Sequence, residues 1–285
     1  MPIELAENRY GKSSVRLLKV LRQADRHEIF EVTVDIACTG DLATAYTEGD
    51  NHGVLPTDTL KNTVYALARE HSFPGMEDFG LLLGRHFLSE NPQLHQVEVA
   101  LTARPWSRIE VAGEPHPHAF VESGAARRRA RVEVGREGIA VRAGIVDLLV
   151  LKTAGSAFEG FPRDRFTTLP EARDRVLATR IDADWSYGGV DLDFGTAFLG
   201  IERRLVEAFA THDSRSLQHT LYAMGEAVLA GFPEVLEIHL RLPNQHYLLA
   251  NLSPFGLDND NEIFVATDEP YGLIEGTLRR RRRAP

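Results

Sequence analysis

One stretch of the chain is echoed by a second, and this echo limits the folds that the chain can adopt. The segment FLSENPQLHQVEVAL begins at Phe87, and the segment VLAGFPEVLEIHLRL begins at Val228. Each runs from the end of an apolar helical pattern, through a proline, into a strand in which apolar and polar residues alternate. The echo predicts a duplicated unit made of strands, a pair of helices and further strands.

The patterns on either side of the two segments fit such a unit. In the first half, strands are expected at 14–21, 29–36 and 94–101, helices at 57–69 and 75–88, and an irregular stretch at 106–120. In the second half, strands are expected at 130–134, 139–151, 175–187 and 235–242, and helices at 195–212 and 216–230. A mostly antiparallel sheet with helices on one face is an α+β layer. We therefore predict two tandem units, 1–124 and 125–285, whose free strand edges association would cover.

Composition excludes several classes of protein. The chain has 285 residues, of which 43% are hydrophobic, and this is enough for a large core. Its formal charge of −9 argues against broad nucleic-acid binding. No apolar run approaches the roughly 20 residues that a membrane helix needs. Cys38 is the single cysteine, so no intrachain disulfide can form and a reducing compartment is expected.

The two termini are where signals that direct a protein to a cellular compartment would lie. The N-terminal residues have no apolar signal core, and the C-terminal RRRRRAP is not a Ser-Lys-Leu address. We expect a cytoplasmic protein that binds neither nucleic acid nor membrane. The basic segment 279–285 is expected to be a disordered, solvated tail.

Five short motifs carry residues suited to chemistry. The first is VLPTDTLKNTVYALAR, from Val54, in which a loop runs into an amphipathic helix. Thr57 or Asp58 is predicted to cap that helix, and taken alone this is an ordinary surface feature. Lys12, in NRYGKSSVR, is by itself a solvated charge.

The other motifs lie in the second half. SAFEGFPRDRFTTLPEARDR contains Phe158 and Arg175, whose phenyl ring and guanidinium fork could together hold a planar anion. SRSLQHTLYAMG places Gln218 at a helix N-terminus, in the last residues of the loop, where its amide could recognise a ligand or simply cap the helix. LPNQHYLLANL places Asn244 and His246 just past a strand end. Each residue, taken singly, is also compatible with a purely structural role.

Metal-ligating residues do not gather in the sequence. Among 11 histidines, only His116 and His118 form a tight pair, and no carboxylate or cysteine spacing completes a ligand set. No GxGxxG, P-loop or flavin motif is present. We expect neither a metal nor an organic cofactor.

Together these motifs support a resemblance to a known family. The string TDTLKNTVYALA closely resembles a signature of the urate oxidases (uricases), which are cofactor-free oxidases of the tunnelling fold, or T-fold, and the other motifs follow in the family's order from Lys12 to His246. The resemblance implies that urate, O₂ and water give 5-hydroxyisourate and hydrogen peroxide. It also implies a homotetrameric barrel with a central tunnel and with active sites between subunits.

The resemblance assigns a role to each motif residue. Lys12 and Thr57 form a proton-handling dyad, and His246 relays protons with it. Phe158 stacks on the urate ring, Arg175 and Gln218 hold its edges, and the backbone N–H of Leu217, where the family usually carries a smaller aliphatic residue, also contacts it. The implied substrate-binding residues are Thr57, Asp58, Phe158, Arg175, Leu217, Gln218 and Asn244, with Asn244 and Thr57 facing the O₂ or water site. Lys12 and Thr57 would come from one chain, and Phe158, Arg175, Gln218 and Asn244 from its neighbour.

Two alternatives remain open on the sequence alone. One is another purine or pterin enzyme of the same fold, although the zinc-binding histidine cluster of the pterin enzymes is not visible here. The other is a non-catalytic purine-binding protein, which would bind urate and leave its absorbance unchanged.

Overall fold

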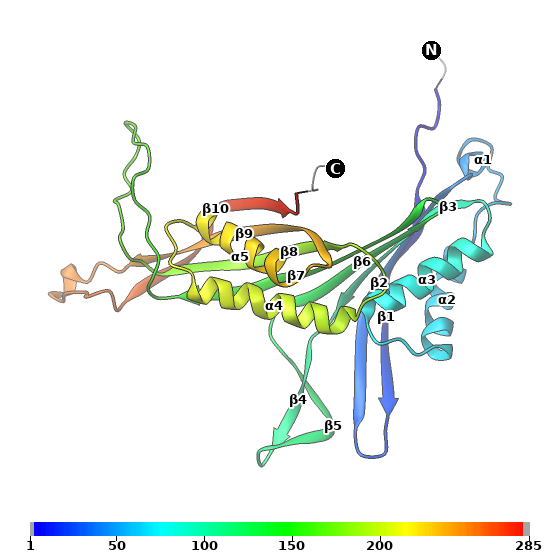
Figure 1. The fold of residues 1–285 in the computed structure, drawn as a ribbon, viewed down its shortest axis with the longest axis horizontal. Coiled ribbons are helices and arrows are strands. Elements are labelled where there is room, and N and C mark those ends of the chain that lie inside the picture. Colours follow the sequence, from blue (N-terminus) through cyan, green and yellow to red (C-terminus); the bar gives the residue numbers. More distant parts are fainter. Residues whose placement is uncertain (1–2, 282–285) are drawn as a thin grey trace. The chain divides into compact units, whose positions relative to one another are not determined.

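The computed structural model describes residues 3–281, which divide into two compact units (Figure 1). The first unit contains the residues up to Gly144 together with Ser186–Phe198, and the second contains Ile145–Trp185 together with the residues from Leu199 onward. Across the described residues, no helix has both the length and the apolar character needed to span a bilayer.

The first unit is an antiparallel sheet with helices packed against it. Its strands are hydrogen-bonded in the order β1-β2-β3-β6, and the first part of β7 follows. Helix α2 packs on β1, and α3 packs on β3 and β6. The bounds are β1 (Tyr10–Arg22), β2 (His27–Gly40), α1 (Ala43–Thr47), α2 (Thr57–Glu70), α3 (Met76–Glu90), β3 (Leu94–Ala103), β6 (Arg127–Gly135) and β7 (Gly138–Lys152).

The core of this unit follows the predicted periodicities. In β2, Val32, Val34 and Ile36 are buried while the residues between them are partly exposed, as expected for a strand with one covered face. On α3, Phe79 and Phe87 are almost completely buried against that sheet. Burial of these alternating side chains is the main stabilising contribution that the pattern predicts.

A two-stranded hairpin replaces the irregular stretch expected at 106–120. Strands β4 (Trp106–Val111) and β5 (Glu114–Glu122) pair antiparallel. Ala112 and Gly113, at their junction, both have positive φ, which suits the tight turn of a hairpin. The hairpin was missed because Pro115 and Pro117 argue against a strand and because most of its side chains are exposed.

The second unit repeats the element order of the first. Two strands, two helices and two strands follow one another, and the strands are hydrogen-bonded in the order β7-β8-β9-β10. Helix α5 packs on β9 and β10. The α+β prediction is confirmed, while the division at 124/125 stays a prediction. The bounds are β8 (Leu177–Tyr187), α4 (Phe194–Thr211), α5 (Leu217–Gly231), β9 (Val235–Leu249), the short 3₁₀ helix η1 (Ser253–Phe255) and β10 (Phe264–Arg279).

The end of the chain departs from the sequence prediction in two places. Strand β9 continues to Leu249 instead of ending at Leu242, and β10 pairs with it along most of its length. Pro243 suggested a strand end because proline lacks a backbone N–H, yet it lies within β9 opposite Leu273.

The arginine run is not a free tail at its beginning. Arg279 is the last residue of β10, and the Arg280 guanidinium donates to the carbonyls of Val235 (2.9 Å), Phe232 (2.9 Å) and Leu229. Next to the C-terminus of α5, the Arg280 cation thereby satisfies the Leu229 carbonyl, which lies in the last turn of the helix. The rest of the predicted tail, 282–285, lies outside the described residues.

Candidate active site

Thr57 and Asp58 lie in the first turn of α2 and do not cap it. The N-cap position is taken by Pro56, without a side-chain capping hydrogen bond, so the predicted cap is wrong. The first backbone N–H groups of α2 therefore have no cap, and the Thr57 side chain beside them is exposed. The Asp58 carboxylate contacts the Lys61 ammonium (2.5 Å) and the Asn62 amide (2.9 Å).

Lys12 is held at an irregularity in β1. The pairing of β1 with β2 shifts register between Lys12 and Val15, and the N–H of Ser14 donates to the Asp35 carboxylate (2.8 Å). The preceding residue must be glycine, because a Cβ on Gly11 would lie 1.8 Å from the carbonyl oxygen of Ile36. Only a glycine lets β1 approach β2 closely enough at this point.

Lys12 lies within electrostatic range of the start of α2. Hydrogen bonds from Lys61 and Asn62 lower the pKa of Asp58, and the charge of Lys12 contributes to this lowering. Since α2 packs on β1, the strand irregularity and the first turn of the helix belong to one surface of the first unit. The structure thus places the predicted proton-handling residues Lys12 and Thr57 on elements that pack together.

Phe158 and Arg175 meet in the segment between β7 and β8. The Arg175 guanidinium carbon lies 5.2 Å from the centre of the Phe158 ring. Phe158 is fixed by two backbone hydrogen bonds with Ala172 (2.7 and 3.0 Å) and by stacking on Phe161 (4.8 Å between ring centres). Arg175 lies two residues before β8, which begins at Leu177 and not at Arg175 as predicted.

One nitrogen of the Arg175 guanidinium is left without a hydrogen bond within residues 3–281. Its Nε is buried and has no hydrogen-bond partner among the described residues. Burial lowers the pKa of the guanidinium, although arginine remains protonated at any physiological pH. A buried, unpaired donor is costly, so its presence beside an aromatic face points to a planar, electron-rich ligand.

Asp174 ties these two residues to one another and was not predicted. Its carboxylate oxygen accepts from the backbone N–H of Ser156 (3.1 Å) and of Arg175 (3.1 Å). One side chain thereby joins the segment that leads to Phe158 with the segment that carries Arg175. The sequence signal was the Asp-Arg pair itself, but sequence alone does not show which backbone groups Asp174 binds.

A second set of hydrogen bonds ties the same segment to the N-terminus of α5. The N–H of Ala157 donates to the Ser214 carbonyl (2.7 Å), and the N–H of Ser214 donates to the Gly155 carbonyl (3.0 Å). The Thr220 hydroxyl donates to the hydroxyl of Ser214 (2.7 Å), and both side chains are fully buried. The first turn of α5 is therefore fixed relative to Phe158.

Leu217 and Gln218 begin α5, so Gln218 lies inside the helix and not in the preceding loop. Ser216 is the N-cap and accepts from the N–H of His219 (3.1 Å), so Gln218 is not the cap. The Leu217 side chain is buried and anchors the turn, whereas the Gln218 side chain is exposed. A fixed helix start with a free amide side chain can bind an electron-rich ligand.

Asn244 and His246 lie within β9, not in a loop past its end. Because they are two residues apart on a strand, they share one face, while Gln245 between them is buried on the other. Asn244 pairs with Gly272 and His246 with Thr267, so 268–271 form a bulge of β10 opposite Gln245. Bulges are frequent where a sheet presents side chains to a ligand.

The predicted site residues thus fall into two groups, one in each unit. Lys12, Thr57 and Asp58 belong to the first unit, and the other six belong to the second. Within residues 3–281, no three or more histidine, cysteine, aspartate or glutamate side chains gather as a metal site would require. His116 and His118 lie on β5, with their ring centres 4.5 Å apart.

Known proteins resemble this chain over almost its full length. A family model described as Uricase matches residues 8–133 and 141–275. The uricase of Arthrobacter globiformis is 45% identical over 278 residues, which are 98% of this chain and 90% of that protein. The uricase of Dictyostelium discoideum is 37% identical over 279 residues, 97% of each protein. The crystal structure of the Arthrobacter globiformis uricase matches with a TM-score of 0.95, covering 100% of this chain and 98% of that one. The chain therefore belongs to the uricase family.

Proposed function

We propose that this chain is a urate oxidase, which converts urate, O₂ and water to 5-hydroxyisourate and hydrogen peroxide. The observation that carries the proposal is the buried Nε of Arg175, which has no hydrogen-bond partner among the described residues, on a guanidinium that lies beside the ring of Phe158 in a chain of the uricase family. Urate is a planar anion whose edges carry adjacent acceptors, and a guanidinium fork matches such an edge. Family membership favours this activity over the pterin alternative.

The second unit supplies the groups that hold the substrate. Phe158 lies against the flat ring, Arg175 donates to one edge, and Gln218 with the backbone N–H of Leu217 binds the other. The segments that carry Phe158 and Arg175 and the start of α5 are fixed before urate arrives, through the hydrogen bonds of Asp174 and Ser214. Preorganisation of this kind lowers the entropic cost of orienting the reactants.

Protons and oxygen are handled by the remaining residues. Urate loses two electrons, O₂ takes them up with two protons to become hydrogen peroxide, and water adds its oxygen to the ring. Lys12, Thr57 and His246 move the protons, and Asn244 with Thr57 holds O₂ and then water above the ring. Asp58, next to Thr57, also contacts the substrate. The ionised urate ring is itself easily oxidised, so the reaction needs neither a metal nor an organic cofactor.

The active form is a homotetramer whose sites lie between subunits. Lys12 and Thr57 come from one chain, and Phe158, Arg175, Gln218 and Asn244 come from its neighbour. Large apolar side chains remain exposed along the strands of the second unit, which supports association of these surfaces. Examples on β7, β9 and β10 are Leu149, Leu248, Val265 and Leu273, each about half exposed. The cytoplasmic location stays a prediction from the sequence.

One assay tests both the reaction and its lack of cofactors. Protein freed of metals by exhaustive chelation is mixed with urate in air, and urate absorbance and peroxide are followed together. The expected result is loss of urate with one peroxide formed for each urate. Activity that returns only with added zinc, copper or iron would contradict the cofactor-free mechanism. Binding of urate without any loss of absorbance would instead favour the non-catalytic alternative.

A further inference from the structure

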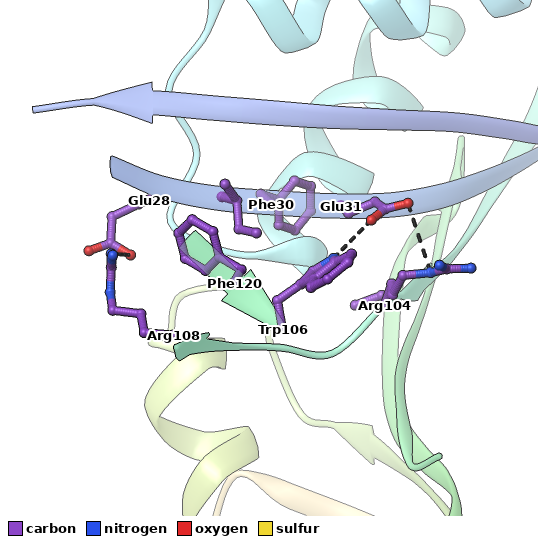
Figure 2. Close-up of a pocket in the computed structure, with 9 residues that line it drawn as sticks. Glu28, Phe30, Glu31, Arg104, Trp106, Arg108 and Phe120 are labelled. Carbon is purple, nitrogen blue, oxygen red and sulfur yellow. Dashed lines mark hydrogen bonds and ion pairs between the residues drawn. The ribbon is translucent and has the colours of Figure 1, made fainter. Parts of the chain in front are cut away.

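Two adjoining cavities lie in the first unit, where the β4–β5 hairpin meets β2 and the end of β3. Figure 2 shows the larger of the two. The larger measures about 310 Å³ and the smaller about 90 Å³, and both border Glu31, Ala103 and Arg104. None of the residues placed in the urate site lines either cavity. The larger is lined by Glu28, Ile29, Phe30, Glu31, Ala103, Arg104, Trp106, Arg108 and Phe120.

The larger cavity has aromatic walls, and neighbouring side chains hold each ring in place. Figure 2 shows Phe30, Trp106 and Phe120 around the same space. The Trp106 indole N–H donates to the Glu31 carboxylate (2.8 Å), and the guanidinium of Arg108 lies 5.0 Å from the centre of the Phe120 ring. Phe30 packs edge-on against Phe73 and Phe79, at 5.4 and 6.4 Å between ring centres. Rings fixed in this way form a site that a flat ring can enter without reorganisation.

The carboxylates that border the larger cavity are already paired. Glu28 forms ion pairs with Arg26 (2.9 Å) and Arg108 (2.9 Å), and Glu31 accepts from Arg16 and Trp106. Burial acts to raise the pKa of Glu31, but the hydrogen bonds from Arg16 and Trp106 outweigh it and keep this pKa below its ordinary value. Both carboxylates therefore already have basic partners, and they do not require a cationic ligand.

The guanidinium of Arg104, which borders both cavities, has weaker ion pairs than these carboxylates have. Its guanidinium lies 3.9 Å from Glu31 and 3.8 Å from Glu122, and both distances are longer than a hydrogen bond. Arg127 lies 3.6 Å from Glu122, which is also too long. The smaller cavity is thus bordered by three guanidiniums, of Arg16, Arg104 and Arg127, two of which have only loose ion pairs. Such groups bind a phosphate or carboxylate with charge-assisted hydrogen bonds.

We propose that the two cavities form one binding site for an aromatic anion, separate from the urate site. The aromatic ring enters the larger cavity, between Phe30, Trp106 and Phe120. The attached phosphate or carboxylate binds Arg104 and reaches Arg127 in the smaller cavity. Both parts of the ligand are needed, because the aromatic side chains of the protein bind only the ring and the arginines bind only the anionic group.

Calorimetric titration of the full-length protein tests the proposal, with phenyl phosphate, benzoate and inorganic phosphate as probes. A saturating, non-oxidisable urate analogue keeps the urate site occupied throughout. We expect phenyl phosphate or benzoate to bind, with the tighter of the two identifying the anionic group, and inorganic phosphate to bind at least about tenfold more weakly. Equal affinity for inorganic phosphate and phenyl phosphate would overturn the role of the aromatic cavity, and absence of binding by both aromatic probes at millimolar concentration would overturn the site.

Three variants locate the binding. Arg104→Gln and Trp106→Phe should each lower the affinity for phenyl phosphate by about tenfold or more, while urate oxidation stays unchanged. Arg131→Gln is the matched control, because Arg131 lies on the same strand as Arg127 but pairs with Glu98 (3.4 Å) and lines neither cavity. Since Trp185 is fully buried, binding should change mainly the emission of Trp106. Equal loss of affinity in Arg131→Gln, or no loss in Arg104→Gln, would contradict the proposal.

Discussion

At the scale of single residues, binding and chemistry are predicted to separate. Arg175 is proposed to contact urate before and during the reaction, whereas Thr57 is proposed to take part in moving protons. Arg175→Ala should therefore cost about 2–5 kcal/mol, largely as weaker binding of a non-oxidisable urate analogue. Thr57→Ala should slow oxidation by roughly 10²–10⁴-fold and leave analogue affinity near normal.

Titration calorimetry and turnover kinetics on the two variants check this assignment. The roles would be reversed if Thr57→Ala abolished analogue binding while Arg175→Ala left it intact.

Gly11 matters because it lets the backbone of β1 approach that of β2 closely. In Gly11→Ala the new Cβ would lie 1.8 Å from the Ile36 carbonyl, so β1 must move away from β2 and carry Lys12 with it. We expect a loss of about 1–3 kcal/mol in the free energy of unfolding and slower urate oxidation. Thermal unfolding and turnover measure the two effects. Gly189→Ala is the control, because a Cβ added there would meet no atom within 4 Å, and a similar loss in this variant would contradict the argument.

The sequence predicted the identity of the site residues better than their local settings. Lys12, Thr57, Phe158 and Arg175 were found because the chain resembles a known family, not because any one pattern required them. Asp174 was missed because its function depends on accepting from Ser156 and Arg175, which are brought together only by the fold. A side chain's backbone partners cannot be read from residue spacing when they lie in separate segments.

At the scale of elements, the site depends on the hydrogen bonds that Asp174 makes within the segment between β7 and β8. Removing the Asp174 carboxylate in Asp174→Ala leaves the backbone N–H groups of Ser156 and Arg175 without an acceptor, at a cost of about 1–3 kcal/mol. Analogue affinity should fall by about tenfold or more, because Arg175 and Phe158 lose their fixed positions.

Asp174→Asn separates positioning from charge. A single oxygen of Asp174 accepts both hydrogen bonds, and an asparagine amide oxygen can do the same. This variant should keep analogue affinity close to that of the unaltered protein. An asparagine variant as weak as the alanine variant would show that the charge of Asp174, and not its acceptor oxygen, is what matters.

Helices and long alternating strands were predicted well, whereas elements marked by proline were not. The core strands β2 and β3 and the helices α2 to α5 follow period-two or helical patterns of burial, which sequence shows directly. Strand β9 was cut short at Pro243, and the β4–β5 hairpin was missed at Pro115 and Pro117. In each case pairing with a neighbouring strand overrides a local signal that argues against a strand.

At the scale of the whole molecule, Lys12 and Thr57, which are predicted to move protons, lie in one compact unit, whereas Phe158, Arg175 and Gln218, which are predicted to hold the ring, lie in the other. Sites that combine two chains are what the resemblance to the uricases implies. The proposed closed oligomer of identical chains would cover the exposed apolar residues of β7, β9 and β10. The oligomeric state cannot be read from periodicity, because a strand face covered by a second chain has the same pattern as one covered within a chain.

Complementation between inactive variants tests the shared site most directly. Lys12→Ala and Arg175→Ala are each expected to be nearly inactive, and the two are refolded together with mixed assembly confirmed by mass. If each site takes Lys12 from one chain and Arg175 from another, roughly a quarter of the sites in a random mixture receive both intact residues. Activity should recover to about that fraction. Mixing Lys12→Ala with Thr57→Ala should recover none, because both residues come from the same chain of a site. Confirmed mixed assemblies of Lys12→Ala and Arg175→Ala that stay inactive would show that each site is built within one chain.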